Sequence, residues 1–287
     1  MDGAVTLRLA TGPVSWGVDF ADAPGNPPWR DVLDGAVRAG YRGLELGPLG
    51  YLPDDVAQEL RARDLRLTAG FVFEPLHDPA ASRRTLEIAR RTAIRVAAAG
   101  GRFLVVIDLV CAERGRTAGR SDLAPRLDAG GRRRLAGTVA AIAEIAGAHG
   151  LRPLVHNHAG THVEFEDEVE PLLDVVELCL DTGHWAYAGH DAVATYARWG
   201  ERIPYLHLKD VDPARCGADF WASVRAGAFR PLGSGTVDFA ALLAAIARER
   251  FDGWAVVEQD REPGSGDPVD DLVASRRFLE EATWACA

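Results

Sequence analysis

Histidine and carboxylate side chains, together with one lysine, recur in the second half of the sequence, each close to the end of a short apolar run. These residues are His156, His158, Asp181, His207, Lys209 and Glu258. Alternate residues of a strand share one face. His156 and His158 of the segment HNH are therefore expected to point the same way, and so are His207 and Lys209 of the segment HLK. Imidazole nitrogens and carboxylate oxygens suit Mn²⁺, Co²⁺, Mg²⁺ or Zn²⁺, and the set contains no cysteine that would favour a thiolate site. The pattern therefore predicts a divalent metal centre.

Four further residues are candidate contacts for a ligand. His184, in the segment LDTGH, faces the same site if a helix begins there, and otherwise caps the turn. Glu45 is an acid in an apolar run and needs a partner. Trp16 ends the first expected strand, where it either walls a pocket or packs in the core. Trp221 lies in a long aromatic segment that is expected to contact the substrate.

The elements that position these residues follow from hydrophobic periodicity. Runs rich in Val, Ile and Leu alternate with segments whose apolar residues return every three or four positions, which is typical of a parallel sheet with helical crossovers. Strands are expected at 12–16, 43–46, 66–72, 103–109, 152–158, 178–181, 205–209 and 254–258. Eight such units in about 250 residues favour a closed barrel, and neither GPVSWG nor GPLGYLP supplies a dinucleotide-binding turn. We therefore predict one (β/α)8 TIM barrel domain over residues 1–287.

In such a barrel the chemistry lies at the carboxyl ends of the strands, where the polar residues above are expected to converge.

The helices are marked by apolar stripes, among them the one formed by Leu135, Val139 and Ile142. Asp238 stands where the N-cap of a later helix is expected. The segments 113–131 and 210–235 are longer than a connection requires, and loops of this length are often functional.

Composition excludes several classes of protein. The net charge of −10, from 42 acidic and 32 basic residues, opposes nucleic-acid binding. No apolar run approaches the roughly 18 residues of a membrane span, and the first residues do not read as a secretory signal, so a cytoplasmic location is expected. The four cysteines, at 111, 179, 216 and 286, have neither metal-site spacing nor the density of a disulfide scaffold.

Seven segments, in order along almost the whole chain, resemble the xylose-isomerase-like barrel superfamily of sugar isomerases, epimerases and endonuclease IV-type enzymes. They are PVSWGV (13–18), LELGPLGYLP (44–53), HNHAGTHVE (156–164), LDTGH (180–184), HLKDVD (207–212), RPLGSGTVDF (230–239) and WAVVEQD (254–260). Within the superfamily the chain is similar to the inosose dehydratases of inositol catabolism and to relatives described as sugar phosphate isomerases/epimerases.

The resemblance implies a set of metal ligands. Strands five to eight of the superfamily usually supply Glu, Asp, His and Glu, and Asp181, His207 and Glu258 match the last three. This chain has His156 at the first position, so either His156 binds the metal or Glu164 folds back from the following loop. Glu164 is the preferred fourth ligand, because it restores the family's set and frees the histidines for proton transfer. The resemblance makes His184 a metal or substrate contact.

The implied activity is loss of water from an inosose or a similar keto-sugar through an enediolate, with Mn²⁺ or Co²⁺ as the expected metal. Such a metal polarises the carbonyl, while a base removes the α-proton and an acid protonates the departing hydroxide. His156 or His158 would be the base. Lys209, the only lysine among 32 basic residues, would supply a positive charge or a proton.

Other functions compete with dehydration. A ketose or sugar phosphate epimerase or isomerase needs the same metal and enediolate, and the Arg-rich segment 113–131 could mark a phosphorylated substrate. A C-glycoside-cleaving lyase uses similar chemistry. An endonuclease IV-like hydrolase would need a basic groove and further metal ligands, and a non-catalytic binding protein would not need an intact metal set. The expected partner is thus a small polyol or keto-sugar, with no nucleic acid and no membrane, and a homo-oligomer stays open.

Overall fold

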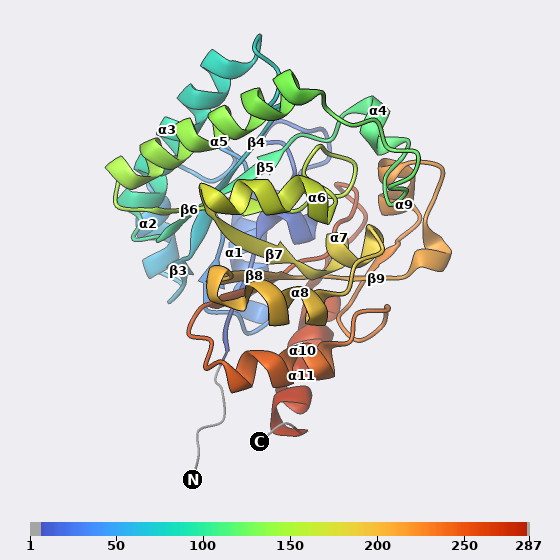
Figure 1. Ribbon diagram of the computed structural model, residues 1–287. Coiled ribbons are helices and arrows are strands. Elements are labelled where there is room, and N and C mark those ends of the chain that lie inside the picture. Colours follow the sequence, from blue (N-terminus) through green and yellow to red (C-terminus); the bar gives the residue numbers. More distant parts are fainter. Residues whose placement is uncertain (1–6, 286–287) are drawn as a thin grey trace.

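The computed structural model describes residues 7–285, in which a ring of parallel strands is surrounded by helices (Figure 1). Nine strands pair in the order β3-β2-β1-β11-β8-β7-β6-β5-β4. They are β1 Arg8–Thr11, β2 Gly43–Leu44, β3 Arg66–Leu67, β4 Ala69–Glu74, β5 Phe103–Asp108, β6 Arg152–His156, β7 Glu177–Asp181, β8 Tyr205–Leu208 and β11 Trp254–Val257. A separate antiparallel pair consists of β9 Asp210–Val211 and β10 Phe229–Arg230.

The sheet closes on itself through β3 and β4, which stand at its two ends and are separated only by Thr68. Across this break the Thr68 N–H donates to Leu44 O and the Leu46 N–H donates to Ala69 O, each at 2.9 Å. β3 and β4 thus act as one interrupted strand, and the ring has eight strand positions. The predicted (β/α)8 barrel is confirmed.

Helices cover the outside of the ring, with α3 and α5 side by side on one flank and α10 and α11 on another (Figure 1). The α-helices are α1 Trp29–Arg38, α2 Val56–Arg61, α3 Ser82–Ala98, α4 Ala112–Gly115, α5 Ala129–Ala148, α6 Glu166–Val169, α7 Thr182–Tyr187, α8 Ala192–Trp199, α9 Phe220–Arg225, α10 Phe239–Arg248 and α11 Val269–Ala285. Short 3₁₀ helices span Pro13–Trp16, Glu170–Asp174, Gly200–Arg202 and Pro213–Arg215. None of the helices described in residues 7–285 has the length and hydropathy of a membrane span.

The apolar runs of the strands face two cores. In β5, Phe103, Val105 and Ile107 point into the barrel, whereas Leu104 and Val106 point into the layer beneath the helices. Both faces of a parallel strand are buried in this architecture, which explains why the runs are continuously apolar. Packed side chains therefore fill the barrel below the site.

The predicted strand at 12–16 is wrong. The first strand ends at Thr11, and Pro13–Trp16 forms a 3₁₀ helix. Pro13 has no N–H to give to a neighbouring strand and fixes its own φ, so it starts a helical turn more readily than it continues a sheet. Trp16 consequently packs in the core over Gly35 of α1 and is only 6% exposed, so it does not wall a pocket.

Other local predictions are confirmed. Leu135, Val139 and Ile142 form the buried stripe of α5, and the Asp238 side chain caps α10 by accepting from the Ala241 N–H at 2.9 Å. The long segments contain α4 in one case and β9, α9 and β10 in the other. The three described cysteines are unpaired, and Cys286 lies outside the described residues.

Candidate active site

Four side chains meet at the carboxyl ends of β6, β7, β8 and β11, and we refer to them as the central tetrad. They are His156, Asp181, His207 and Glu258. His156 Nε2 lies 3.2 Å from His207 Nδ1 and 3.4 Å from Asp181 Oδ2. His207 Nδ1 lies 3.8 Å from Asp181 Oδ2 and 3.2 Å from Glu258 Oε2. All four side chains are buried. Ligand atoms of His156, Asp181 and His207 lie within 4.8 Å of one another, and Glu258 adjoins this group through His207.

The spacing of the tetrad fits a divalent cation. Ligand atoms about 2.1 Å from a tetrahedrally coordinated ion lie about 3.4 Å from one another, close to the four separations given above. Asp181 Oδ2 is buried and accepts no hydrogen bond of good geometry, although His156 Nε2 and Lys209 Nζ each lie 3.4 Å away, so it has room to bind a further cation. Both observations indicate that these residues can hold a metal ion.

The region beneath the tetrad fixes the orientation of His207. Glu45 Oε1 lies 3.0 Å from His207 Nε2 and also accepts from the Tyr205 hydroxyl at 2.9 Å. That hydroxyl lies 2.7 Å from Thr68 Oγ1. A carboxylate on the far nitrogen of a metal-binding histidine sets its tautomer and ring angle. Glu45, predicted as a substrate contact, is only 1% exposed and instead supports His207 from below.

Asp181 is held by its backbone and by one of its oxygens. The Asn157 amide donates to Asp181 O and accepts from the Asp181 N–H, both at 2.9 Å. Asp181 Oδ1 caps α7 by accepting from the His184 N–H at 2.9 Å. A helix therefore begins at Thr182, within LDTGH, as the orientation of His184 towards the site required, and the cap leaves Asp181 Oδ2 free to face the tetrad.

Lys209 lies among the acids above the tetrad. Its Nζ is 3.4 Å from Asp181 Oδ2 and 3.2 Å from Glu258 Oε2. The same Nζ is 2.6 Å from Asp260 Oδ1 and donates to His184 Nε2 at 3.1 Å. Burial opposes the charge, but the surrounding carboxylates raise the pKa of Lys209 well above its ordinary value. Lys209 is therefore a fixed positive charge at the site.

Two further imidazoles lie beside the tetrad and face each other. The rings of His158 and His184 are 3.8 Å apart. Burial, with neighbouring positive groups, lowers the pKa of both well below the ordinary histidine value, so both are neutral. His158 Nδ1 lies 2.8 Å from the Ala159 carbonyl oxygen, to which it donates its proton. The Nε2 of His158 is thereby left as an acceptor, as a general base requires.

Three residues at the site escaped the sequence prediction. Asp260, two residues after Glu258, lies on the same side as Lys209, and strand periodicity would have indicated it. Burial and the nearby Asp260 raise the pKa of Asp19 to about 7, and Asp19 lines the cavity. Phe220 lies 5.2 Å from the His158 ring. No sequence signal marked Asp19. The sequence marked the aromatic segment 210–235 that contains Phe220, but not Phe220 itself as a site residue.

Trp221, predicted to contact the substrate, packs against Phe220 with ring centroids 5.0 Å apart. It is not among the residues that line the cavity. Phe220 is the aromatic residue of this segment that reaches the histidines. The segment predicted as functional thus reaches the site through Phe220, and substrate contact by Trp221 stays a prediction.

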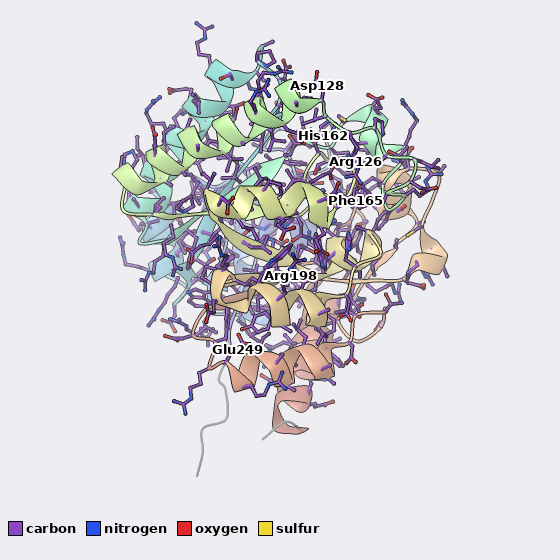
Figure 2. The ribbon with its side chains drawn as sticks, in the orientation of Figure 1. Arg126, Asp128, His162, Phe165, Arg198 and Glu249 are labelled. Atoms are coloured by element: carbon purple, nitrogen blue, oxygen red, sulfur yellow. The ribbon has the colours of Figure 1, made fainter. Side chains whose placement is uncertain are left out.

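Glu164, the preferred fourth ligand of the prediction, lies apart from the tetrad, whereas the alternative, His156, lies in it. Glu164 Oε2 lies 3.1 Å from Arg114 Nη2, and Oε1 accepts from the Gly119 N–H at 2.6 Å. Arg114 is fully buried and also donates to both oxygens of Glu168, at 2.6 and 3.0 Å. Figure 2 shows Arg126 next to Phe165, where its guanidinium lies 4.5 Å from the ring centroid. Arg114 and Arg126 therefore anchor the Arg-rich segment internally.

A hollow at the mouth of the barrel, the site cavity, spans about 370 Å³ including its open side. Its lining consists of Val14, Asp19, Phe71, Phe73, Ile107, His156, His158, His207, Lys209, Glu258 and Asp260. Most of these residues carry hydrogen-bonding groups. A small polar ligand suits such a space.

Comparison with known proteins identifies the family. A model of the family described as "Xylose isomerase-like TIM barrel" matches residues 33–282. The chain belongs to this family. An inosose dehydratase from Clostridium botulinum is 29% identical over 151 residues, which is 49% of this chain and only about half, 51%, of that relative. An inosose dehydratase from Lacticaseibacillus casei is 27% identical over 96% of both chains. The rhizopine catabolism protein MocC of Rhizobium meliloti is 30% identical over 92% of this chain and 85% of its own.

Solved structures share the fold. The IOLI protein with a bound zinc atom has a TM-score of 0.74 and 15% identity, and covers 98% of this chain and 99% of its own. An L-ribulose 3-epimerase has a TM-score of 0.73 and 17% identity, and covers 98% of this chain and 96% of its own. At these identities the likeness establishes the barrel architecture of this family member.

Proposed function

We propose that this protein is a metal-dependent lyase that removes water from an inosose or a similar keto-sugar. The observation that carries the proposal is that three members of the central tetrad, His156, His207 and Glu258, line one cavity with a neutral imidazole, His158, whose Nε2 is free to accept a proton. Elimination next to a carbonyl needs both a carbonyl-polarising group and such a base. Relatives named inosose dehydratase match along nearly the whole chain, which supports the substrate class.

The tetrad would hold the metal, with His156 in place of the superfamily's glutamate. When bound, the ion supplies polarisation of the substrate carbonyl and stabilises the enediolate charge. Mn²⁺ or Co²⁺ suits a set of two imidazoles and two carboxylates, and Zn²⁺ is bound in the structural neighbour IOLI. Glu45 fixes the His207 ring, and Asn157 fixes the position of Asp181.

The protons are moved by groups that the tetrad leaves free. His158 Nε2 takes the α-proton. Throughout this step the Nδ1–H of His158 keeps donating its hydrogen bond to the Ala159 carbonyl oxygen. Asp19, with a pKa near 7, keeps a proton on part of the molecules at neutral pH and can give it to the departing hydroxide. Lys209, whose pKa is well above its ordinary value, is a poor proton donor, and it acts instead as a positive charge among the acids.

The test is the product formed from 2-keto-myo-inositol by protein stripped with a chelator and reloaded with Mn²⁺, Co²⁺, Mg²⁺ or Zn²⁺. We expect ultraviolet absorbance of an unsaturated or diketone product, and loss of water by mass spectrometry, only after reloading. An Asp181→Asn variant should show neither signal. Epimerised ketone that retains its water would instead establish the epimerase alternative, and no turnover with any of the four metals would reject the proposal.

A further inference from the structure

A second, more open hollow continues outward from the site cavity. It spans about 890 Å³ including its open side and lies between the 19–22 loop, β4 and α3. Asp19, Phe71 and Phe73 line both the cavity and this hollow, so the two spaces are continuous. We refer to the hollow as the outer groove. A substrate held at the tetrad could extend into it without crossing a wall.

Aromatic rings lead from the proton-transferring histidine into the outer groove. The His158 ring lies 5.5 Å from that of Phe73. Phe73 in turn stacks on Phe20 with a centroid distance of 5.8 Å and an interplanar angle of 25°. Phe20 stands at the rim and keeps 43% of its surface exposed. The floor of the groove is thus a stacked pair of rings, one of which remains open to solvent.

The walls of the groove differ in character. Ile88 of α3 and Leu49, which follows β2, add apolar surface beside the rings. Arg84 and Arg91, also on α3, bring hydrogen-bond donors to the outer end, and Arg84 Nη2 lies 3.3 Å from Glu74 Oε1. An apolar floor with donors at its far edge is suited to a flat ring that carries polar substituents at its rim.

We propose that the outer groove is a subsite for a second ring, so that the substrate is a keto-cyclitol or keto-sugar bearing a ring substituent. The inference rests on the proposed function for the first ring, which occupies the polar cavity. A single polyol ring has its hydrogen-bonding partners in that cavity and gains nothing from Phe20. A second ring stacked on Phe20 and Phe73 gains both burial and a directed aromatic contact. Aryl and sugar rings share this stacking chemistry.

The experiment compares three kinds of compound: 2-keto-myo-inositol, its positional mono-O-benzyl ethers and its positional mono-O-glucosides. Each is measured with the metal-loaded native protein for kcat/KM and, by calorimetry, for Kd. We expect at least one substituted isomer to exceed the parent about ten-fold in kcat/KM. Preference for benzyl or glucosyl then identifies the kind of ring.

Two variants assign the preference to the groove. Phe20→Ala should remove most of the ten-fold advantage while leaving kcat/KM for the parent compound unchanged. Ile94→Ala is the matched control. Ile94 is apolar and 48% exposed, much like Phe20, and it lies on α3, the helix that lines the groove, but outside the groove itself. It should alter neither value.

The outcomes separate this inference from the function on which it rests. If the parent is dehydrated but no substituted isomer surpasses it, or if Phe20→Ala slows all compounds equally, the subsite is rejected and the function stands. If no compound is dehydrated, the proposed function fails. The calorimetric Kd of the substituted compounds then decides the subsite alone: tighter binding than the parent that is lost in Phe20→Ala supports it, and equal or absent binding overturns it.

Discussion

Replacing Arg114 by Met should destabilise the fold strongly and in a pH-dependent way. Arg114 is fully buried, and its guanidinium pairs with Glu164, which is also fully buried, and with Glu168, which is mostly buried. Met keeps much of the side-chain volume but leaves two carboxylates without their cation. Breaking a buried ion pair in this way typically costs about 3–5 kcal/mol. In a domain of this size that corresponds to a fall in Tm of roughly 6–20 °C.

The sign of the pH dependence follows from the two acids. Burial opposes the ionisation of Glu168, but the hydrogen bonds and charge of Arg114 lower its pKa, so the pair stabilises the native protein above the ordinary glutamate pKa and less as the pH falls through it. Burial already raises the pKa of Glu164. Without Arg114 both folded pKa values rise, and protonation then relieves the unpaired charges. The deficit of the variant should therefore be largest near pH 8 and shrink towards pH 5.

The assay is urea denaturation followed by circular dichroism at both pH values, with Arg126→Met as the control. Arg126 pairs with Glu168 as well, but its side chain is 31% exposed, so its loss should cost less than half as much. A deficit for Arg114→Met that is equal at both pH values would mean that lost packing, and not unpaired charge, causes it. A deficit below about 1 kcal/mol, the usual worth of an exposed pair, would refute the interpretation of the buried ion pair.

Three other substitutions test the roles assigned at the site. His158→Ala should lower kcat about 10²- to 10⁴-fold while metal affinity, measured by calorimetry, is unchanged; equal kcat would remove His158 as the base. Glu45→Gln should weaken metal binding about 10- to 100-fold through His207, and an unaltered affinity would reject that support. Lys209→Arg should abolish most of the turnover, because a planar guanidinium cannot reproduce the contacts of Nζ with Asp260 and His184. Undiminished turnover would show that a positive charge in any form suffices.

Much of the site could be predicted because it follows from strand periodicity and barrel geometry. His156 and His158, and likewise His207 and Lys209, are two residues apart, and the structure places all four at one cavity. The fold could be predicted for the same reason, since alternating apolar runs leave few architectures open.

The errors arose where local pattern and tertiary contact diverge. PVSWGV has the apolar character of a strand, but Pro13 turns it into a 3₁₀ helix and carries Trp16 into the core. Glu164 has the residue type of a metal ligand, yet its carboxylate pairs with Arg114, which lies fifty positions earlier in the chain. Asp19 and Phe220 reach the site only because loops from distant parts of the chain meet over the barrel, and no periodicity encodes that meeting.

The central claim is that His156, Asp181, His207 and Glu258 hold one divalent cation. The most direct test is calorimetric titration of chelator-stripped protein with Mn²⁺, for the native chain, His156→Ala and Glu164→Gln. We predict one Mn²⁺ per chain in the native protein, binding weakened at least about 100-fold in His156→Ala, and native affinity in Glu164→Gln. Native affinity in His156→Ala together with lost binding in Glu164→Gln would contradict the account.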